Sequence, residues 1–150
     1  MSEDPKIASI GLVGCSSMKR DDAAPARLLY ASPLFRSALA LAEARHEFVY
    51  IISAKYELVT LDQEIEPYEK TIADLAKEWR AVWGTRVWGS IMTRHRDQDR
   101  QVTIYAGKEY ASPIIRAGFH QATFQQPLAR LQVGQRLRWL SEQLRAECAA

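Results

Sequence analysis

Polar residues that could bind an anionic or planar ligand gather in short segments of the sequence. Ser16 and Ser17 could hold a phosphate or the edge of a base with their hydroxyl and backbone N–H groups, or could only cap nearby backbone groups. Lys19 and Lys55 carry the charge that anion binding needs, although both could instead be solvent-exposed. Tyrosines in the same segments could stack on a base or pack with a hydrated hydroxyl. These tyrosines are Tyr56, Tyr68 and Tyr110.

Other catalytic chemistries have less support. Cys15 has no histidine in a recognisable partnership, so we interpret it as a small buried residue rather than a nucleophile. Asp62, Glu64 and Glu66 fit a solvated loop, although one of them could act as an acid or base. The three histidines have no metal-ligand spacing, and the sequence contains neither a Gly-x-x-x-x-Gly-Lys phosphate loop nor a Gly-x-Ser-x-Gly motif. We therefore expect neither a metal nor a cofactor.

These segments follow predicted strands. Apolar, β-branched and aromatic runs predict strands at residues 7–14, 48–52 and 102–106, and a weaker fourth strand at 118–123. In an open parallel sheet, ligands bind at the carboxyl ends of the strands. We therefore expect the polar segments to converge at one edge of the sheet.

Helices are predicted between the strands. Ser32 and Pro33 open a helix that runs to residue 45, and a last helix spans 134–148. The remaining predictions concern two helices. One begins at a Thr71–Asp74 capping box with Trp79 and Trp83 in the core, and one covers 108–117 with Pro113 in its first turn. This alternation predicts a single α/β domain of three layers, with about four mainly parallel strands and helices on both faces.

Length and composition limit the class of protein. A chain of 150 residues, 47% hydrophobic and 25% charged, fits one globular domain rather than a disordered chain or a membrane span. Residues 1–6 are polar and acidic, unlike a secretory signal, so we expect a cytoplasmic protein with a flexible tail at 1–6. Residues 1–75 hold eight Lys/Arg and twelve Asp/Glu, whereas 76–150 hold twelve and six. The basic half fits solvated helix faces or a phosphate-facing surface.

An ordered set of motifs resembles a known family from about residue 9 to residue 140. The motifs are Val13-Gly-Cys-Ser-Ser-Met-Lys19, Ala26-Arg-Leu-Leu-Tyr-Ala-Ser-Pro-Leu-Phe35, Ile52-Ser-Ala-Lys-Tyr56, Ile65-Glu-Pro-Tyr68, Ala106-Gly-Lys-Glu-Tyr110 and Gly134-Gln-Arg-Leu137. Together they resemble the bacterial YaaA-like domain of unknown function, the DUF6884 group. The Ser-x-x-Tyr and Pro-Tyr pairing resembles the peroxide-stress protein YaaA. The Cys-Ser-x-x-Lys opening is similar to a module of archaeal enzymes that modify 7-deazaguanine in tRNA. These groups are related to the uracil-DNA glycosylase-like fold.

The resemblance implies a domain that acts on a nucleobase or nucleic acid, and a pocket built from these motifs. The implied pocket residues are Cys15, Ser16, Ser17, Lys19, Ser53, Lys55, Tyr56, Pro67, Tyr68 and Tyr110. The motif Gly134-Gln135 would add to it. In one departure, Glu57 stands where family members usually have Gly, which puts the backbone conformation there in question, since Glu enters a left-handed turn only at a cost.

The function that this resemblance favours is an N-glycosidase that excises a modified or damaged base from DNA. A carboxylate would stabilise the positive charge on the sugar, with Glu66 preferred over Asp62, and Lys55 or Lys19 could attack an abasic sugar. Arg130 and Arg136 could hold flanking phosphates. Repair is one such role, and a hypermodified phage base as substrate would indicate antiviral defence. The alternatives are a DNA-binding stress protein without catalysis and an enzyme that acts on a free nucleoside.

Overall fold

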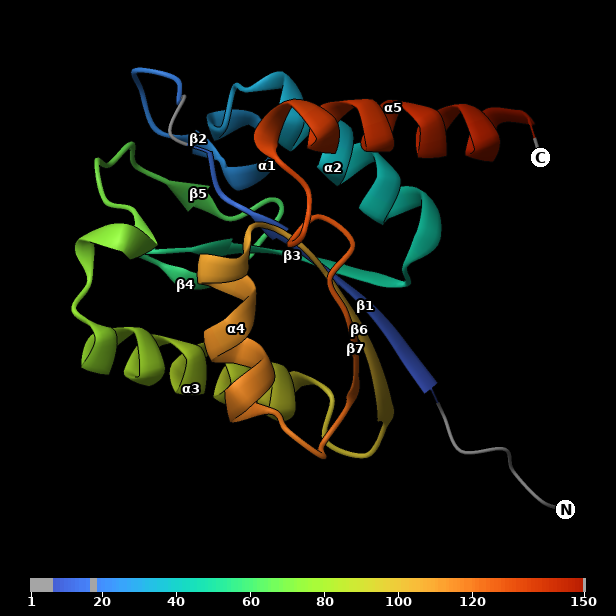
Figure 1. Cartoon of the computed structure of the whole chain (residues 1–150). Coiled ribbons are helices and arrows are strands. Elements are labelled where there is room, and N and C mark those ends of the chain that lie inside the picture. The colour runs from blue at the N-terminus through green and yellow to red at the C-terminus, as the bar shows by residue number, and fades with distance from the viewer. Residues whose placement is uncertain (1–6, 17–18, 150) are drawn as a thin grey trace, which may run out of the picture.

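A five-stranded sheet forms the centre of the molecule in the computed structural model, which describes residues 7–16 and 19–149 (Figure 1). The strands lie in the order β4-β3-β1-β6-β7. Neighbours among β3, β1, β6 and β7 pair in parallel, whereas β4 pairs antiparallel with β3 at one edge. The strand bounds are Ile7–Gly14 (β1), Phe48–Ser53 (β3), Glu57–Thr60 (β4), Asp99–Tyr105 (β6) and Thr123–Gln125 (β7). The predicted parallel sheet is confirmed, with one additional edge strand.

Helices cover both faces of this sheet, as Figure 1 shows. On one face lie α2 (Pro33–Arg45) and α5 (Val133–Ala149), and on the other lie α3 (Lys77–Arg94) and α4 (Lys108–Ala117). The smaller elements are α1 (Ala26–Leu29), the 3-10 turn η1 (Ile72–Asp74), and the antiparallel pair β2 (Ala24–Pro25) and β5 (Glu64–Ile65). Among the residues described, no helix is both long and apolar enough to cross a membrane. The expected tail, 1–6, lies outside these residues.

Alternating side chains of β1 bind the two layers of helices to the sheet. Ile10 and Leu12 are fully buried in the core beneath α3 and α4, whereas Val13 belongs to the core beneath α2 and α5. On the α2 side, Gly11 makes room for the ring of His46, which a Cβ at position 11 would approach to 2.8 Å. The strand is thus buried on both faces, as expected for the central strand of a parallel sheet.

The chain reverses its direction of travel across the sheet at β1. From β1 it crosses through α2 to β3 on one side, and later reaches β6 on the other side through α3. The carboxyl end of β1 therefore stands at a topological switch point, where open α/β sheets leave room for a ligand. The predicted convergence of polar segments falls at this end.

Two predictions about strands and one about a helix start were wrong. The fourth parallel strand is 123–125 rather than 118–123, because 118–122 turns out of α4. The predicted segment without regular structure, 53–70, contains β4, which forms a hairpin with the preceding β3, and β5, which pairs with the distant β2. The Thr71 N–H does bond the Asp74 carboxylate at 2.9 Å, but this box caps only the 3-10 turn.

The helix predictions need two further corrections. Trp83 is buried as predicted, but Trp79 is 62% exposed, because α3 begins only at residue 77 and presents its first turn to solvent. Pro113 lies inside α4 rather than in its first turn. The N-cap of α2 is confirmed, since Ser32 Oγ accepts the Phe35 N–H at 3.1 Å and Pro33 follows as the first helical residue.

Candidate functional site

The ends of three neighbouring parallel strands meet at the switch point. Cys15 follows β1, Ser53 ends β3 and Gly107 follows β6. The Cys15 N–H donates to the Ile52 carbonyl at 3.1 Å, which extends the β1–β3 pairing beyond the end of β1. The three predicted segments that begin at these residues therefore lie side by side, as expected. Ser17, predicted with them, lies outside the described residues.

A cavity of about 380 Å³ opens beside these strand ends. Its walls come from the ends of β1 and β6, from the first turns of α2 and α4, and from the segment that leads into α5. The lining residues are Gly14, Cys15, Ser16, Ser32, Leu34, Phe35, Ala38, Tyr105, Ala106, Gly107, Glu109, Tyr110, Leu128, Val133 and Arg136. We refer to it as the switch-point cavity. An apolar lining with a few polar groups is typical of small-molecule sites.

Tyr110 supplies a hydroxyl to the switch-point cavity. Its oxygen lies 3.4 Å from Cys15 Sγ and accepts the Ile72 N–H at 3.3 Å, and its ring packs edge-on against Trp83. Burial raises the pKa of the Tyr110 hydroxyl, and nearby Cys15 raises it further. The hydroxyl therefore stays protonated at neutral pH and can donate a hydrogen bond.

A carboxylate and a guanidinium meet at the Gly107 edge of the cavity. A Cβ at Gly107 would lie 3.0 Å from Glu109 Oε2 and 3.2 Å from Arg136 Nη1, so both side chains rest against this glycine. Arg136 Nε donates to the Leu131 carbonyl at 2.9 Å, which orients the guanidinium. Glu109 is the one carboxylate among the residues that line the cavity.

Beside the cavity lies a buried hydrogen-bonded cluster of Ser53, Tyr68 and Tyr30. Ser53 Oγ accepts the N–H groups of Lys55 and Tyr56, at 3.2 and 3.0 Å, so its own proton points to Tyr68 Oη, 2.6 Å away. Tyr68 in turn lies 2.7 Å from Tyr30 Oη. Burial raises the pKa of Tyr30 to about 12 and also raises that of Tyr68. Ser53, predicted to bind substrate, thus holds Tyr68 in place.

Lys19, predicted as a binding residue, lies over this cluster. Its Nζ is 4.3 Å from the centroid of the Tyr68 ring and 5.8 Å from that of Tyr30, within reach of cation–π attraction. Burial lowers the pKa of Lys19, while Cys15 and Glu69 oppose this effect. Lys55 is exposed, with its Nζ 5.2 Å from the centroid of the Tyr56 ring.

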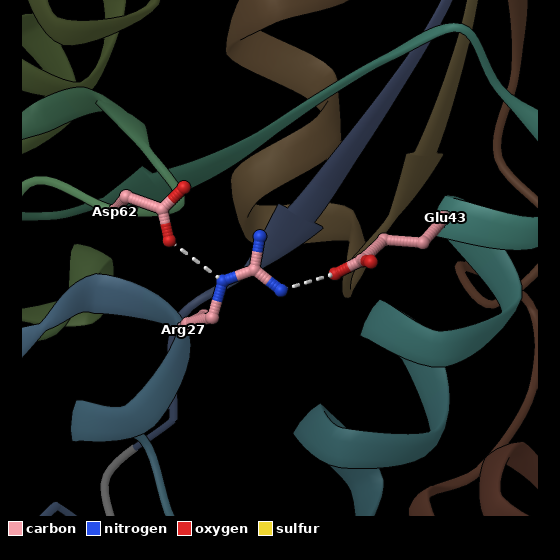
Figure 2. Close-up of polar contacts among 3 residues, drawn as sticks. All are labelled: Arg27, Glu43 and Asp62. Carbon is pink, nitrogen blue, oxygen red and sulfur yellow. Dashed lines mark hydrogen bonds and ion pairs between the residues drawn. The ribbon is translucent and has the colours of Figure 1, made fainter.

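The carboxylates predicted for catalysis lie outside the cavity lining. Glu66 is exposed, and its backbone carbonyl accepts the Tyr56 hydroxyl at 3.3 Å, next to half-buried Pro67. Asp62 Oδ1 accepts Arg27 Nε at 2.9 Å, and the same guanidinium donates to Glu43 at 3.1 Å (Figure 2). Arg27 thus draws Asp62 into an ion pair that joins the loop to α2.

Among the residues predicted near α5, only Arg136 lines the cavity. Arg130, Gly134 and Gln135 are exposed and are not among the lining residues. The Gln135 side chain accepts the Gln132 N–H at 3.1 Å, so it caps the start of α5.

Glu57 does adopt the left-handed conformation that the resemblance put in question. Its φ is 64°, at the turn from β3 into β4, and its carboxylate lies 2.6 Å from Arg86 Nε. Glu57 therefore makes a left-handed turn at a cost in backbone strain.

Comparison with known proteins shows the family. A profile described as a family of unknown function, DUF6884, matches residues 10–142. The chain belongs to the DUF6884 family. No curated protein and no solved structure matches it. The span of the DUF6884 match includes every residue of the switch-point cavity, so the cavity is part of the domain that defines the family.

Sequence reasoning missed two parts of the site in this DUF6884 chain. Glu109 stands in the segment 107–110, which the sequence places after a strand, but no periodic pattern distinguishes it from other helix-start carboxylates. The first turn of α2, with Leu34 and Phe35, forms a wall that depends on how α2 crosses the sheet. The position of Glu109 beyond a strand end and in the first turn of a helix was the one signal available.

Proposed function

We propose that this protein excises a modified or damaged nucleobase from DNA by hydrolysing its N-glycosidic bond. The observation that carries the proposal is the switch-point cavity, which combines apolar walls with one carboxylate, Glu109. Its volume of about 380 Å³ lies within the range of small-molecule sites. The rings of Phe35 and Tyr110 could pack against a planar base that has left the DNA helix.

The reaction would use a proton acceptor, the Glu109 carboxylate, and a hydrogen-bond donor, the Tyr110 hydroxyl, at the cavity. The bond between C1′ of the sugar and the base nitrogen breaks, water supplies the oxygen that binds C1′, and the base leaves with a proton. Positive charge develops on the sugar, so the Glu109 carboxylate would stabilise it and accept a proton from the water, and this proton would then pass to the nitrogen of the departing base. The Tyr110 hydroxyl, whose raised pKa keeps it protonated, would donate a hydrogen bond to the departing base.

The family resemblance supports the same proposal. Its motifs are similar to those of the peroxide-stress protein YaaA and of the archaeal module that acts on 7-deazaguanine in tRNA. From these motifs we infer a relationship to the uracil-DNA glycosylase-like fold, which the three-layer arrangement around a mostly parallel sheet is consistent with. On this proposal the partner is DNA, and the role is repair or antiviral defence in the cytoplasm.

Abasic-site formation tests the proposal. Purified protein is incubated with DNA that contains normal, damaged or hypermodified bases, and abasic sites are detected by alkaline strand cleavage. We expect one substrate class to react, and Glu109→Gln to slow excision by about 10²–10⁴-fold, as for loss of a general base. Glu66→Gln and Asp62→Asn serve as matched controls.

The outcomes separate the candidate functions. If Glu66→Gln lost excision activity while Glu109→Gln remained active, Glu66 would be the catalytic carboxylate instead of Glu109. DNA binding without abasic sites on any substrate would favour the binding-only stress protein. Cleavage of free nucleosides alone would favour the nucleoside enzyme.

A further inference from the structure

A second hollow, of about 520 Å³, lies between α3 and α4 on the opposite face of the sheet from α2 and α5. We refer to it as the α3–α4 groove. Its charged lining residues are four cations and one carboxylate: Lys77, Arg80, Lys108, Arg116 and Glu109. The other lining residues are Ala81, Thr85, Ser112, Pro113 and Ala117. Glu109 lines the switch-point cavity as well, so the two hollows share a wall.

A close backbone contact between α3 and α4 determines where the groove lies. A Cβ at Gly84 would lie only 2.4 Å from the Pro113 carbonyl oxygen, so α3 approaches α4 without a side chain between them. Pro113 itself lines the groove. The side chains that project on either side of this contact therefore form its walls.

The cations of the groove are available to an anion. Among the described residues, none of these four cations forms an ion pair. Arg80 donates to the carbonyls of Leu75 and Ala73, at 2.9 and 3.3 Å, which holds its guanidinium in position. Lys77, Lys108 and Arg116 are exposed. A bound anion would therefore displace no internal partner.

We infer that the α3–α4 groove binds the phosphate backbone of the DNA strand whose base enters the switch-point cavity. This inference rests on the proposed function. Lys108 and Arg116 stand eight residues apart on α4, about 12 Å along the helix axis, a length that spans three to four nucleotides of one strand. A row of cations over that length suits successive phosphates of a strand better than a single phosphate. The wall shared at Glu109 places this backbone next to the cavity.

Salt-dependent binding tests the groove separately from catalysis. Fluorescence anisotropy is measured with a labelled single-stranded DNA of roughly 15 nucleotides, for the wild type and for Lys77→Gln/Arg116→Gln. The matched control is Arg36→Gln/Arg145→Gln, which removes the same charge from exposed positions on α2 and α5. We expect the groove variant to bind about tenfold more weakly and its slope of log K against log salt to fall by about 1.4, with the control unchanged.

Each outcome bears on the groove and on the proposed function in a different way. An equal loss of DNA affinity in the groove variant and the control would overturn the inference, and so would the absence of DNA binding by the wild type. Groove-dependent binding of a deoxynucleoside monophosphate or inorganic phosphate as tight as that of the oligonucleotide would overturn the strand assignment. Groove-dependent DNA binding without abasic sites would support the groove while rejecting the proposed glycosidase.

Discussion

Ser53 joins the end of β3 to the tyrosine cluster beside the cavity. It is fully buried, and its hydroxyl contacts two backbone N–H groups and Tyr68. Its carbonyl also accepts the indole N–H of Trp83 at 2.9 Å. Removing the hydroxyl would leave several buried polar groups without a partner, and an unsatisfied buried group costs more than the net value of a hydrogen bond. The conformation of the segment that follows β3 therefore depends on this one side chain.

Ser53→Ala should lower the free energy of unfolding by about 1–3 kcal/mol. Urea denaturation measures the change. Ser90→Ala is the control, because its hydroxyl bonds only the Arg86 carbonyl on an exposed part of α3, so we expect a change of about 0.5 kcal/mol or less. A value for Ser53→Ala as small as that of the control would mean that the tyrosine cluster reorganises without cost.

The left-handed conformation of Glu57 gives a second prediction at this scale. Glu57→Gly should be more stable than Glu57→Ala by about 1 kcal/mol, because both lose the Arg86 ion pair but only Ala keeps a Cβ at a φ of 64°. Comparing the two variants by urea denaturation measures the free-energy cost of a Cβ in this backbone conformation. The usual order, with Ala more stable than Gly, would contradict the left-handed turn.

At the scale of elements, α3 and α4 depend on a backbone contact that no side chain mediates. Gly84 and Gly89 lie in the same helix, and glycine is unfavourable in a helix interior, yet α3 continues to residue 94. They differ in surroundings, since a Cβ at Gly84 would meet the Pro113 backbone, whereas a Cβ at Gly89 would have no atom within 4 Å. Gly84 is therefore required for the close packing of α3 against α4, whereas Gly89 has open space around it.

Gly84→Ala and Gly89→Ala should change stability in opposite directions. Overpacking at Gly84 should lower the free energy of unfolding by about 1–3 kcal/mol, whereas Gly89→Ala should raise it by up to about 1 kcal/mol through helix propensity. Urea denaturation compares the two variants directly. Stabilisation by both would show that α4 can move away from α3 at little cost.

At the scale of the whole molecule, one half-buried histidine, His46, connects three elements. Ser9 Oγ on β1 lies 2.9 Å from His46 Nδ1, and Tyr105 Oη at the end of β6 lies 2.6 Å from His46 Nε2. His46 itself caps α2. Burial lowers the pKa of His46 below its ordinary value of 6.5, and nearby Arg45 lowers it further. The folded state thus favours a neutral ring at this junction.

The stability of the fold should therefore fall on mild acidification. Below pH 6.5 the unfolded chain takes up a proton at this histidine more readily than the folded protein does, so stability is lost as the pH falls toward the lowered pKa. The urea midpoint should be lower at pH 5.5 than at pH 7.5, and His46→Gln should reduce that difference. His120→Asn, at an exposed histidine, should leave it unchanged. An undiminished difference in His46→Gln would assign the acid sensitivity to other groups.

Local sequence patterns were sufficient to predict the alternation of strands and helices, four parallel strands and the convergence of polar segments at one edge. Hydrophobic periods, caps such as Ser32 and the rule for parallel strand ends depend on residues close in sequence or on general topology. Trp79 was misplaced because its helical spacing is the same whether its turn is packed or exposed. The edge strand β4 was missed for a local reason: it is only four residues long, and the turn that joins it to β3, residues 54–56, contains none of the Gly, Asn or Asp residues that indicate a hairpin.

Only the tertiary structure decided which side chains line the cavity. The segment 61–70 has no periodic pattern, so the directions of its side chains depend on contacts that are distant in sequence. Arg27 holds Asp62, and the Tyr56 hydroxyl bonds the backbone of Glu66. Glu109 reaches the cavity because α4 begins at the end of β6 beside β1. Residue types and strand ends are local properties, whereas the position of a carboxylate relative to a cavity depends on the packing of the whole chain.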